Sequence, residues 1–317
     1  MPSASSASYV TSNSLPLLLF PSTRSSSSST PMTAVIATND SIAPALWPSD
    51  LARVQLGRYT DYAKSPWRRV PLTTDAMLDW MEIIPALGPT TRVGEKRIIY
   101  TSRVLDSEMK VQPPVDITFF VHSFIRSINV EPLGNWSTKE IHAPSAVQHV
   151  TLVSGDHNDA FNPQLHALAR LKEVVSLLTG AEEHVLDSTP AEAIRVERTV
   201  FTKLRSDSEL DPPPRADLTD ELDPGQKARQ IAKHWIVNPL IPTFLRRTDG
   251  RDKSVPYHGF RIGDFVEVTV APQIHSVRRE GQQQPTLQFV INKLVKLYSH
   301  QDAKTVLGST TSSMDTT

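Results

Sequence analysis

The stretch "GFRIGDFVEVTV", residues 259–270, is the part of the sequence that decides the fold. A Gly-Asp turn signal precedes a run in which Val266, Val268 and Val270 alternate with other residues. Successive side chains of a strand point to opposite faces, so the three valines face the same way. The stretch therefore predicts a β-strand with one face turned to a core.

A second strand is predicted at "TLQFVINKLVKLY", residues 286–298. The polar stretch "RREGQQQP" (278–285) lies between the two strands, and the three parts together predict a β-hairpin with a long, mobile loop. Apolar residues stand on both faces of the second strand. They are Leu287, Phe289 and Ile291 on one face, and Val290 and Leu294 on the other. This pattern fits a strand covered on both sides, or one bent by a bulge near Asn292.

The hairpin is similar in general build to strand pairs of oligonucleotide-binding barrels, whose sheet face and loops hold single strands. We therefore expect an α+β fold: a β-rich core with an open, barrel-like (OB-like) sheet, a few amphipathic helices, and disordered N- and C-terminal tails. Residues 94–127 and 263–299 have a similar order of Gly-acid turn, loop and Pro-bounded strand. Either the two segments are a repeat, or the match is a coincidence of common turn signals.

Other elements follow from periodicity and capping residues. Helical spacing predicts a long helix from Asn162 to a left-handed Gly180, and a short helix capped by Thr73 or Thr74 that includes Met81 and Ile84. Further segments are expected as strands at 96–105, 115–124 and 146–155, as a helix or a strand at 190–205, and as a helix at 225–237.

Composition divides the chain into five parts. The ends are rich in Ser and Thr, which bury too little apolar surface to offset the entropy of ordering them. The organisation that we expect is a disordered tail at 1–42, an α+β domain at 43–205, an acidic Pro-rich linker at 206–225, a helix and β-hairpin region at 226–302 that could pack on the first domain, and a second tail at 303–317. The N-terminal segment has the Ser content of an organellar transit peptide but only one arginine, which favours a plain flexible tail.

The chain has no cysteine, which excludes disulfides, thiolate metal sites and cysteine nucleophiles. A reducing compartment, the nucleus or the cytoplasm, is therefore expected, without membrane attachment. The sequence contains neither of the glycine-rich phosphate loops, no G-x-S-x-G elbow and no H-E-x-x-H pair. No cofactor is expected, and an enzyme is less favoured than a binding protein.

One cluster has the residue types of a metal or acid-base site, at Asp156 and His157 with Asp159 and His166 nearby. Carboxylates and imidazoles this close could bind a divalent ion. The same residues also suit a turn between a strand and a helix, and this interpretation is favoured.

Basic residues interleaved with aromatic ones are the second candidate site. Single-strand binding requires cations that neutralise phosphates and flat rings on which bases stack. The candidate nucleic-acid-binding residues are Trp67, Arg68, Arg69, Arg246, Arg247, Arg251, Lys253, Tyr257, Phe260, Arg261, Arg278 and Arg279. For Trp67 or Phe260 taken alone, a core position that requires no ligand is the favoured interpretation.

The favoured function is a binding protein whose partner is single-stranded DNA or RNA, with Arg246, Arg247, Arg251, Arg278 and Arg279 expected to line one groove. Because the formal net charge of the chain is -1, such binding would depend on local patches. The alternatives are a structural or scaffolding protein that contacts a protein partner or forms a homo-oligomer, and a metal-dependent enzyme at Asp156 and His157.

Overall fold

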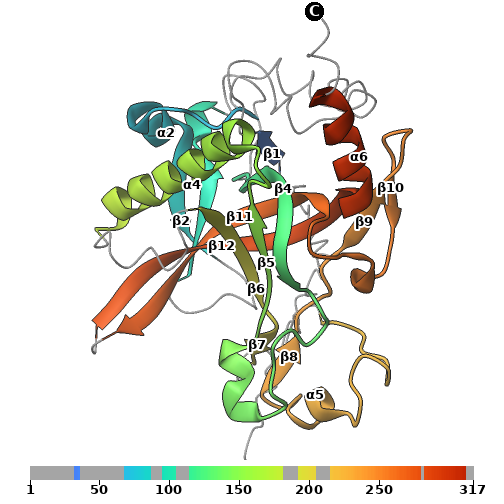
Figure 1. Cartoon of the computed structure of the whole chain (residues 1–317). Coiled ribbons are helices and arrows are strands. Elements are labelled where there is room, and N and C mark those ends of the chain that lie inside the picture. Colours follow the sequence, from blue (N-terminus) through green and yellow to red (C-terminus); the bar gives the residue numbers. More distant parts are fainter. Residues whose placement is uncertain are drawn as a thin grey trace, which may run out of the picture. The chain divides into compact units, whose positions relative to one another are not determined.

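The computed structural model of the chain describes residues 32–35, 68–86, 95–104, 114–180, 192–204, 215–279 and 282–311. These residues form a mixed α+β structure dominated by strands (Figure 1). Ten strands share one sheet and two short strands form another. The large sheet contains β1 (Met32–Val35), β2 (Met81–Pro85), β3 (Lys96–Tyr100), β4 (Ile117–Asn129), β5 (Val147–Val153), β6 (Ala193–Thr199), β9 (Thr243–Arg246), β10 (Asp252–Ser254), β11 (Phe265–Arg279) and β12 (Gln282–Tyr298).

Five of these strands form a ring. In order around the ring, β4 pairs with β5, β5 with β6, β6 with β12, β12 with β11, and β11 with β4 again. All neighbours are antiparallel except β6 and β12, which are parallel and meet only at Val290 and Glu197. A five-stranded, partly open barrel of this kind is the OB-like architecture that the sequence predicts. The expected fold class is therefore confirmed.

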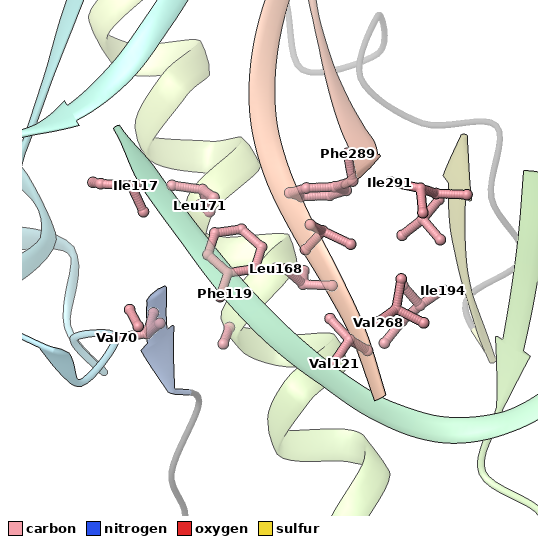
Figure 2. Close-up of a cluster of buried hydrophobic side chains, with 14 of the residues drawn as sticks. Val70, Ile117, Phe119, Val121, Leu168, Leu171, Ile194, Val268, Phe289 and Ile291 are labelled. Atoms are coloured by element: carbon pink, nitrogen blue, oxygen red, sulfur yellow. The ribbon is translucent and has the colours of Figure 1, made fainter. Parts of the chain in front are cut away.

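The first strand of the opening hairpin faces the core as predicted. Val266, Val268 and Val270 are completely buried. Figure 2 shows Val268 among side chains of β4 and α4 (Asn158–Thr179), with Val121 of β4 and Leu168 of α4 nearby. Burial of these apolar side chains in one cluster is the main force that holds α4 on the barrel.

The second strand is both bent and covered on two sides. Thr269 pairs with Lys293 and Val270 with Ile291, so Asn292 is the extra residue of a β-bulge, at the predicted position. The face opposite the core packs in a separate cluster that includes Leu297 and Ala303. Ala303 belongs to helix α6 (His300–Thr311), so this helix covers the outer face of the hairpin where the sequence predicts a tail from residue 303.

The loop of the hairpin is much shorter than predicted. Backbone pairing continues to Arg279 and Gln282, where the sequence predicts a long loop at 278–285. Polar residues are typical of a loop in the sequence, whereas the backbone continues as a two-stranded ribbon that projects from the barrel (Figure 1). Whether 94–127 repeats this hairpin stays open, since in the described part of that segment β3 and β4 are connected by an isolated bridge between Ile99 and Asp116.

The helices begin and end close to their sequence signals, with two corrections. Gly180 ends α4 with a φ of 65°, as predicted, but the helix begins at Asn158 because the turn before it places His157 at the cap position. Thr73 caps α2 (Thr74–Trp80) by accepting a hydrogen bond from the backbone of Ala76. Met81 and Ile84, predicted in the same helix, belong to β2, because pairing with β3 overrides the local helical spacing.

The segments that the sequence left open or assigned to helix are mostly strands. Residues 190–205 contain β6 and β7 (Phe201–Lys203), and 225–237 contain only one helical turn, α5 (Lys227–Gln230), before β8 (Trp235–Val237). β7 and β8 form the small second sheet. The short 3-10 helices are η3 (Glu140–Ser145) and η5 (Tyr257–Gly259).

Part of the predicted acidic linker is packed structure. From residue 215 the chain is described, and Leu218 lies in a hydrophobic cluster with Trp136 and Phe201. The buried carboxylate of Asp223 accepts hydrogen bonds from the backbone N–H groups of Ala228 and Arg229. This carboxylate thus caps α5, which explains why an acid in this segment is buried.

Candidate nucleic-acid interface

Arg246, predicted to bind phosphate, belongs to the interior of the protein. Its side chain is completely buried and lies 2.9 Å from Glu267 and 2.5 Å from Asp252. Burial alone would lower the pKa of the guanidinium, but the two carboxylates outweigh it and raise the pKa above its ordinary value. The residue is therefore a structural ion-pair partner, and the prediction for Arg246 is wrong.

The ion pairs of Arg246 are part of a network that crosses five strands. Glu267 of β11 also lies 3.1 Å from His122 of β4, and Asp252 of β10 lies 2.6 Å from Lys293 of β12. Burial would raise the pKa of the Asp252 carboxyl, but hydrogen bonds from Arg246 and Lys293 outweigh it and hold that pKa below its ordinary value. Two acids of this region, Glu267 and Asp252, are thus held in ion pairs within the network.

A third acid of this region, the buried Asp264, is also held in an ion pair. Its carboxylate lies 2.9 Å from Lys296 and accepts hydrogen bonds from the backbone N–H groups of Arg261 and His300. Lys296 also lies over the ring of Phe260, which is buried at 6% exposure. Phe260 is therefore a core residue and offers no free ring to a base, so its predicted role is wrong.

Four bases around β9 and β10 remain at the surface. Arg247, Arg251, Lys253 and Arg261 are exposed, and among the described residues none of their side chains has an ion-pair partner. We call these four residues the basic edge. Arg247 and Arg251 are held close by a backbone hydrogen bond across the turn that joins the two strands. The half-buried ring of Tyr257 lies in the segment between Lys253 and Arg261.

Carboxylates balance little of this charge. Asp252 and Asp264 are committed to Arg246, Lys293 and Lys296, and the exposed Asp249 caps its own turn by accepting a hydrogen bond from the backbone of Arg251. The basic edge consequently carries a local excess of positive charge on a chain whose formal net charge is -1. Such an excess attracts polyanions.

The other predicted bases are not shown to join this edge. Gln283, the partner of Arg278, is 11 residues along β12 from Leu294, where β9 begins to pair. At a rise of about 3.3 Å per residue, the stretch of β12 between the two positions is at most about 36 Å long. The single groove expected for Arg246, Arg247, Arg251, Arg278 and Arg279 stays a prediction, because the side chains of Arg278 and Arg279 lie outside the described residues.

The remaining candidates lie elsewhere in the chain. Arg68 and Arg69 are half-buried beside the buried Val70, and each already makes a contact within the protein. Trp67 lies outside the described residues. The side chains of Arg278 and Arg279 also lie outside the description, although their backbone is paired.

The cluster at Asp156 and His157 is a strand-to-helix turn, as the favoured interpretation of the sequence holds. Gly155 and Asp156 both have positive φ, of 57° and 72°, which reverses the chain before α4. The ring of His157 stacks on Phe124 with 5.9 Å between centroids. Within the described ranges, no group of three His, Asp or Glu side chains is placed to hold a metal ion.

The sequence analysis missed a polar cleft of about 420 Å³ beside the end of β6. Its walls come from β6, β11, β12 and the segment before β9, and they include Arg198, Gln273 and Asn292. Once 193–199 is assigned as a strand, Arg198 falls on the same side as the buried Ile194 and Val196. A base on the core-facing side of a strand is the signal that could have identified it.

Comparison with known proteins yields no family. No family model matches the sequence, and no curated protein matches it. Three solved structures of the single-stranded DNA-binding protein from bacteriophage Enc34 are similar to it at 10% identity: the complex with ssDNA (TM-score 0.25), a C-terminal truncation (0.27) and the protein itself (0.26). Each covers 69% of this chain, and the match spans 96%, 96% and 90% of the respective structures. TM-scores of this size do not locate a site in this chain.

One further observation concerns membranes. In the part of the chain that the structure describes, no helix is long and apolar enough to cross a bilayer.

Proposed function

We propose that this protein binds single-stranded nucleic acid, with the phosphates of the strand held by the basic edge of Arg247, Arg251, Lys253 and Arg261. The proposal rests on which charged residues around β9 and β10 form ion pairs. The acids Asp252 and Asp264 form ion pairs with Arg246, Lys293 and Lys296, whereas the bases of the edge remain exposed and have no such partner among the described residues.

The physical reason is the release of counterions. A phosphate backbone holds condensed cations, and each protein cation that replaces one gains the entropy of its release. Exposed bases that already had a carboxylate partner would first have to lose that partner. Within the described part of the chain, the four side chains of the basic edge have no carboxylate partner to lose, so they are available to phosphates.

The barrel adds a suitable framework, but fold alone does not imply function. OB-like barrels bind single strands when charged side chains and aromatic rings lie together on the surface. Here the half-buried Tyr257 lies four residues after Lys253 and four before Arg261, whereas Phe260, which directly precedes Arg261, is buried. We assign it the role of the stacking platform.

The test compares two doubly substituted variants with equal loss of charge. Arg251→Gln with Lys253→Gln removes half of the basic edge. Lys227→Gln with Lys233→Gln removes two exposed lysines at and just after α5, which lies away from β9 and β10 (Figure 1). Fluorescence anisotropy with labelled oligothymidylate and oligouridylate, measured over a range of salt concentrations, gives the affinity and its salt dependence.

We expect the basic-edge variant to bind more weakly and to reduce the slope of log affinity against log salt by about 1.4, since each lost contact with a single-strand phosphate accounts for about 0.7. The control variant should retain the slope of the unmodified protein. Equal slopes for the two variants would contradict the assignment to the basic edge. If the unmodified protein binds neither polymer, the proposed function itself is wrong, and a protein partner becomes the better explanation.

A further inference from the structure

The cleft next to β6 contains the guanidinium of Arg198, which forms no ion pair with a carboxylate of the described residues. Arg198 is half-buried at the end of β6, and in the described residues its side chain has neither an ion pair nor a hydrogen bond. Burial lowers the pKa of this guanidinium, and no neighbouring acid offsets the effect. The protein thus keeps a partly desolvated positive charge in a concave site, which an anionic ligand would stabilise.

The adjacent acid on the same strand is already occupied. The carboxylate of Glu197 accepts hydrogen bonds from Arg195 and from Gln288, each at 3.1 Å. Glu95 is the acid in the lining of the cleft, but it is not a cause of the pKa shift of Arg198. An anion that enters the cleft would therefore gain Arg198 without having to displace a partner.

Two side-chain amides in the cleft are also available to a ligand. Asn292 is the exposed bulge residue of β12, and Gln273 lies on β11; among the described residues neither side chain makes a hydrogen bond. By contrast, the amide of Asn238 is fixed by Thr202 and by the backbone of Thr199. A bulge can re-aim a side chain towards a site, and an amide both donates and accepts hydrogen bonds.

These features define the chemistry of the ligand. A guanidinium selects a phosphate, and amides pair with the donors and acceptors on the edge of a base. The volume of about 420 Å³ is within the range of about 300–1,000 Å³ that is typical of small-ligand sites. We propose that the cleft binds one nucleoside phosphate, with its phosphate on Arg198 and its base edge on Asn292 and Gln273.

The ligand could be one unit of a bound strand or a free nucleotide. The first case rests on the proposed function. It has a geometric basis, because Pro242 of the cleft directly precedes β9, and Arg247 of the basic edge directly follows it. Five residues of extended chain span about 17 Å, so the two sites lie at opposite ends of one short strand.

The experiment titrates the full chain with thymidine 5′-monophosphate and, separately, with an oligothymidylate of about 12 nucleotides, within the site size of one OB-like barrel. The variants are Arg198→Met, which removes the charge, and Asn292→Ala, which removes an amide without changing the charge. Arg126→Met is the matched control, since Arg126 is an exposed base on β4 that has no ion-pair partner among the described residues. Isothermal titration calorimetry gives the affinities, and thermal unfolding confirms that each variant is folded.

We expect Arg198→Met to weaken binding of the mononucleotide at least about tenfold, because a hydrogen-bonded charge pair is lost, and Asn292→Ala to weaken it less. The control should bind as the unmodified protein does. A parallel loss for the oligothymidylate identifies a strand unit as the ligand, and an unchanged oligothymidylate affinity identifies a free nucleotide.

The inference is overturned if Arg198→Met and the control have equal affinity for both probes. It is also overturned if only the polymer responds to Arg198→Met while Asn292→Ala has no effect, since a general loss of charge would explain that result. If the unmodified protein does not bind the oligothymidylate, the proposed function is wrong. The mononucleotide titration still tests whether the cleft binds a nucleoside phosphate.

Discussion

Arg246 and Arg198 belong to the same sheet but differ in their surroundings. Arg246 is completely buried between two carboxylates, and Arg198 is half-buried with no carboxylate partner in the described part of the chain. A buried guanidinium is tolerated when it is paired, and its partner then depends on it equally. The same residue type therefore has a structural role at one position and is available to a ligand at the other.

The ion pair of Arg246 and Glu267 gives a test of this dependence. We expect Arg246→Leu to lower the free energy of unfolding by about 3–5 kcal/mol, because Glu267 is left buried without its strongest partner. Replacing both residues with leucine should recover much of the loss, since no uncompensated charge remains. Urea unfolding of the two variants measures the difference. A cost below about 1 kcal/mol for the single variant would show that Arg246 is not buried as described.

The ion pairs of Asp252 can be tested by measuring stability as a function of pH. Arg246 and Lys293 hold the pKa of its carboxyl below its ordinary value, so the folded state binds a proton less readily than the unfolded state. The stability from this carboxylate is therefore complete above the ordinary pKa, of about 3.9, and is lost as the pH falls through the lower pKa of the folded state. Unfolding measured against pH should show Asp252→Asn less stable than the unmodified protein at neutral pH, with the difference shrinking below about pH 3.9. A constant difference across this range would be inconsistent with the ion pairs.

The sequence identifies the basic residues but does not show which of them are buried and which are exposed. Arg246 and Arg247 are adjacent, and one is buried while the other is exposed. The partner of Arg246, Glu267, is 21 residues away in the chain and reaches it only because β9 and β11 both pair with β12. Periodicity within a segment contains no information about such pairing between segments.

At the scale of elements, α6 has a packing role. Ala303, on the buried face of this helix, is only 3% exposed and packs in a cluster with Phe265 and Leu297 of the hairpin. We expect Ala303→Asp to lower the free energy of unfolding by more than about 2 kcal/mol, because an unpaired charge enters an apolar contact. Lys304→Asp, at the exposed neighbouring position, should change stability by about 0.5 kcal/mol or less. Chemical denaturation compares them, and equal effects would mean that α6 does not pack on the hairpin.

The hairpin shows which element features follow from sequence. The alternation of valines predicted the face of β11. Apolar residues on both sides of β12 left two interpretations open, a strand covered on both sides and a bulge near Asn292, and the structure has both features. The length of the strands was not predictable, because the polar residues around 278–285 suit a loop and an exposed ribbon equally. Helical spacing likewise misplaced Met81 and Ile84, since the strand partner of β2 lies in a separate segment.

At the scale of the whole molecule, the order of strands places the two candidate sites. The hairpin predicted an OB-like barrel, and the ring of β4, β5, β6, β12 and β11 confirms it. The sheet continues from β12 to β9 and β10, which with their connecting turn provide Arg247, Arg251 and Lys253 of the basic edge, while the cleft of Arg198 opens where β6 meets β12. Both sites therefore adjoin β12, although their residues are spread through the sequence from Arg198 to Asn292.

The salt dependence of oligonucleotide binding by the unmodified protein tests the central claim most directly. If the four bases of the basic edge contact phosphates of a single strand, log affinity should fall linearly with log salt concentration, with a slope of about -2.8. The slope should become steeper by about 0.7 if Arg198 also holds a phosphate of the same strand. A slope near zero, or no measurable binding at low salt, would contradict the account.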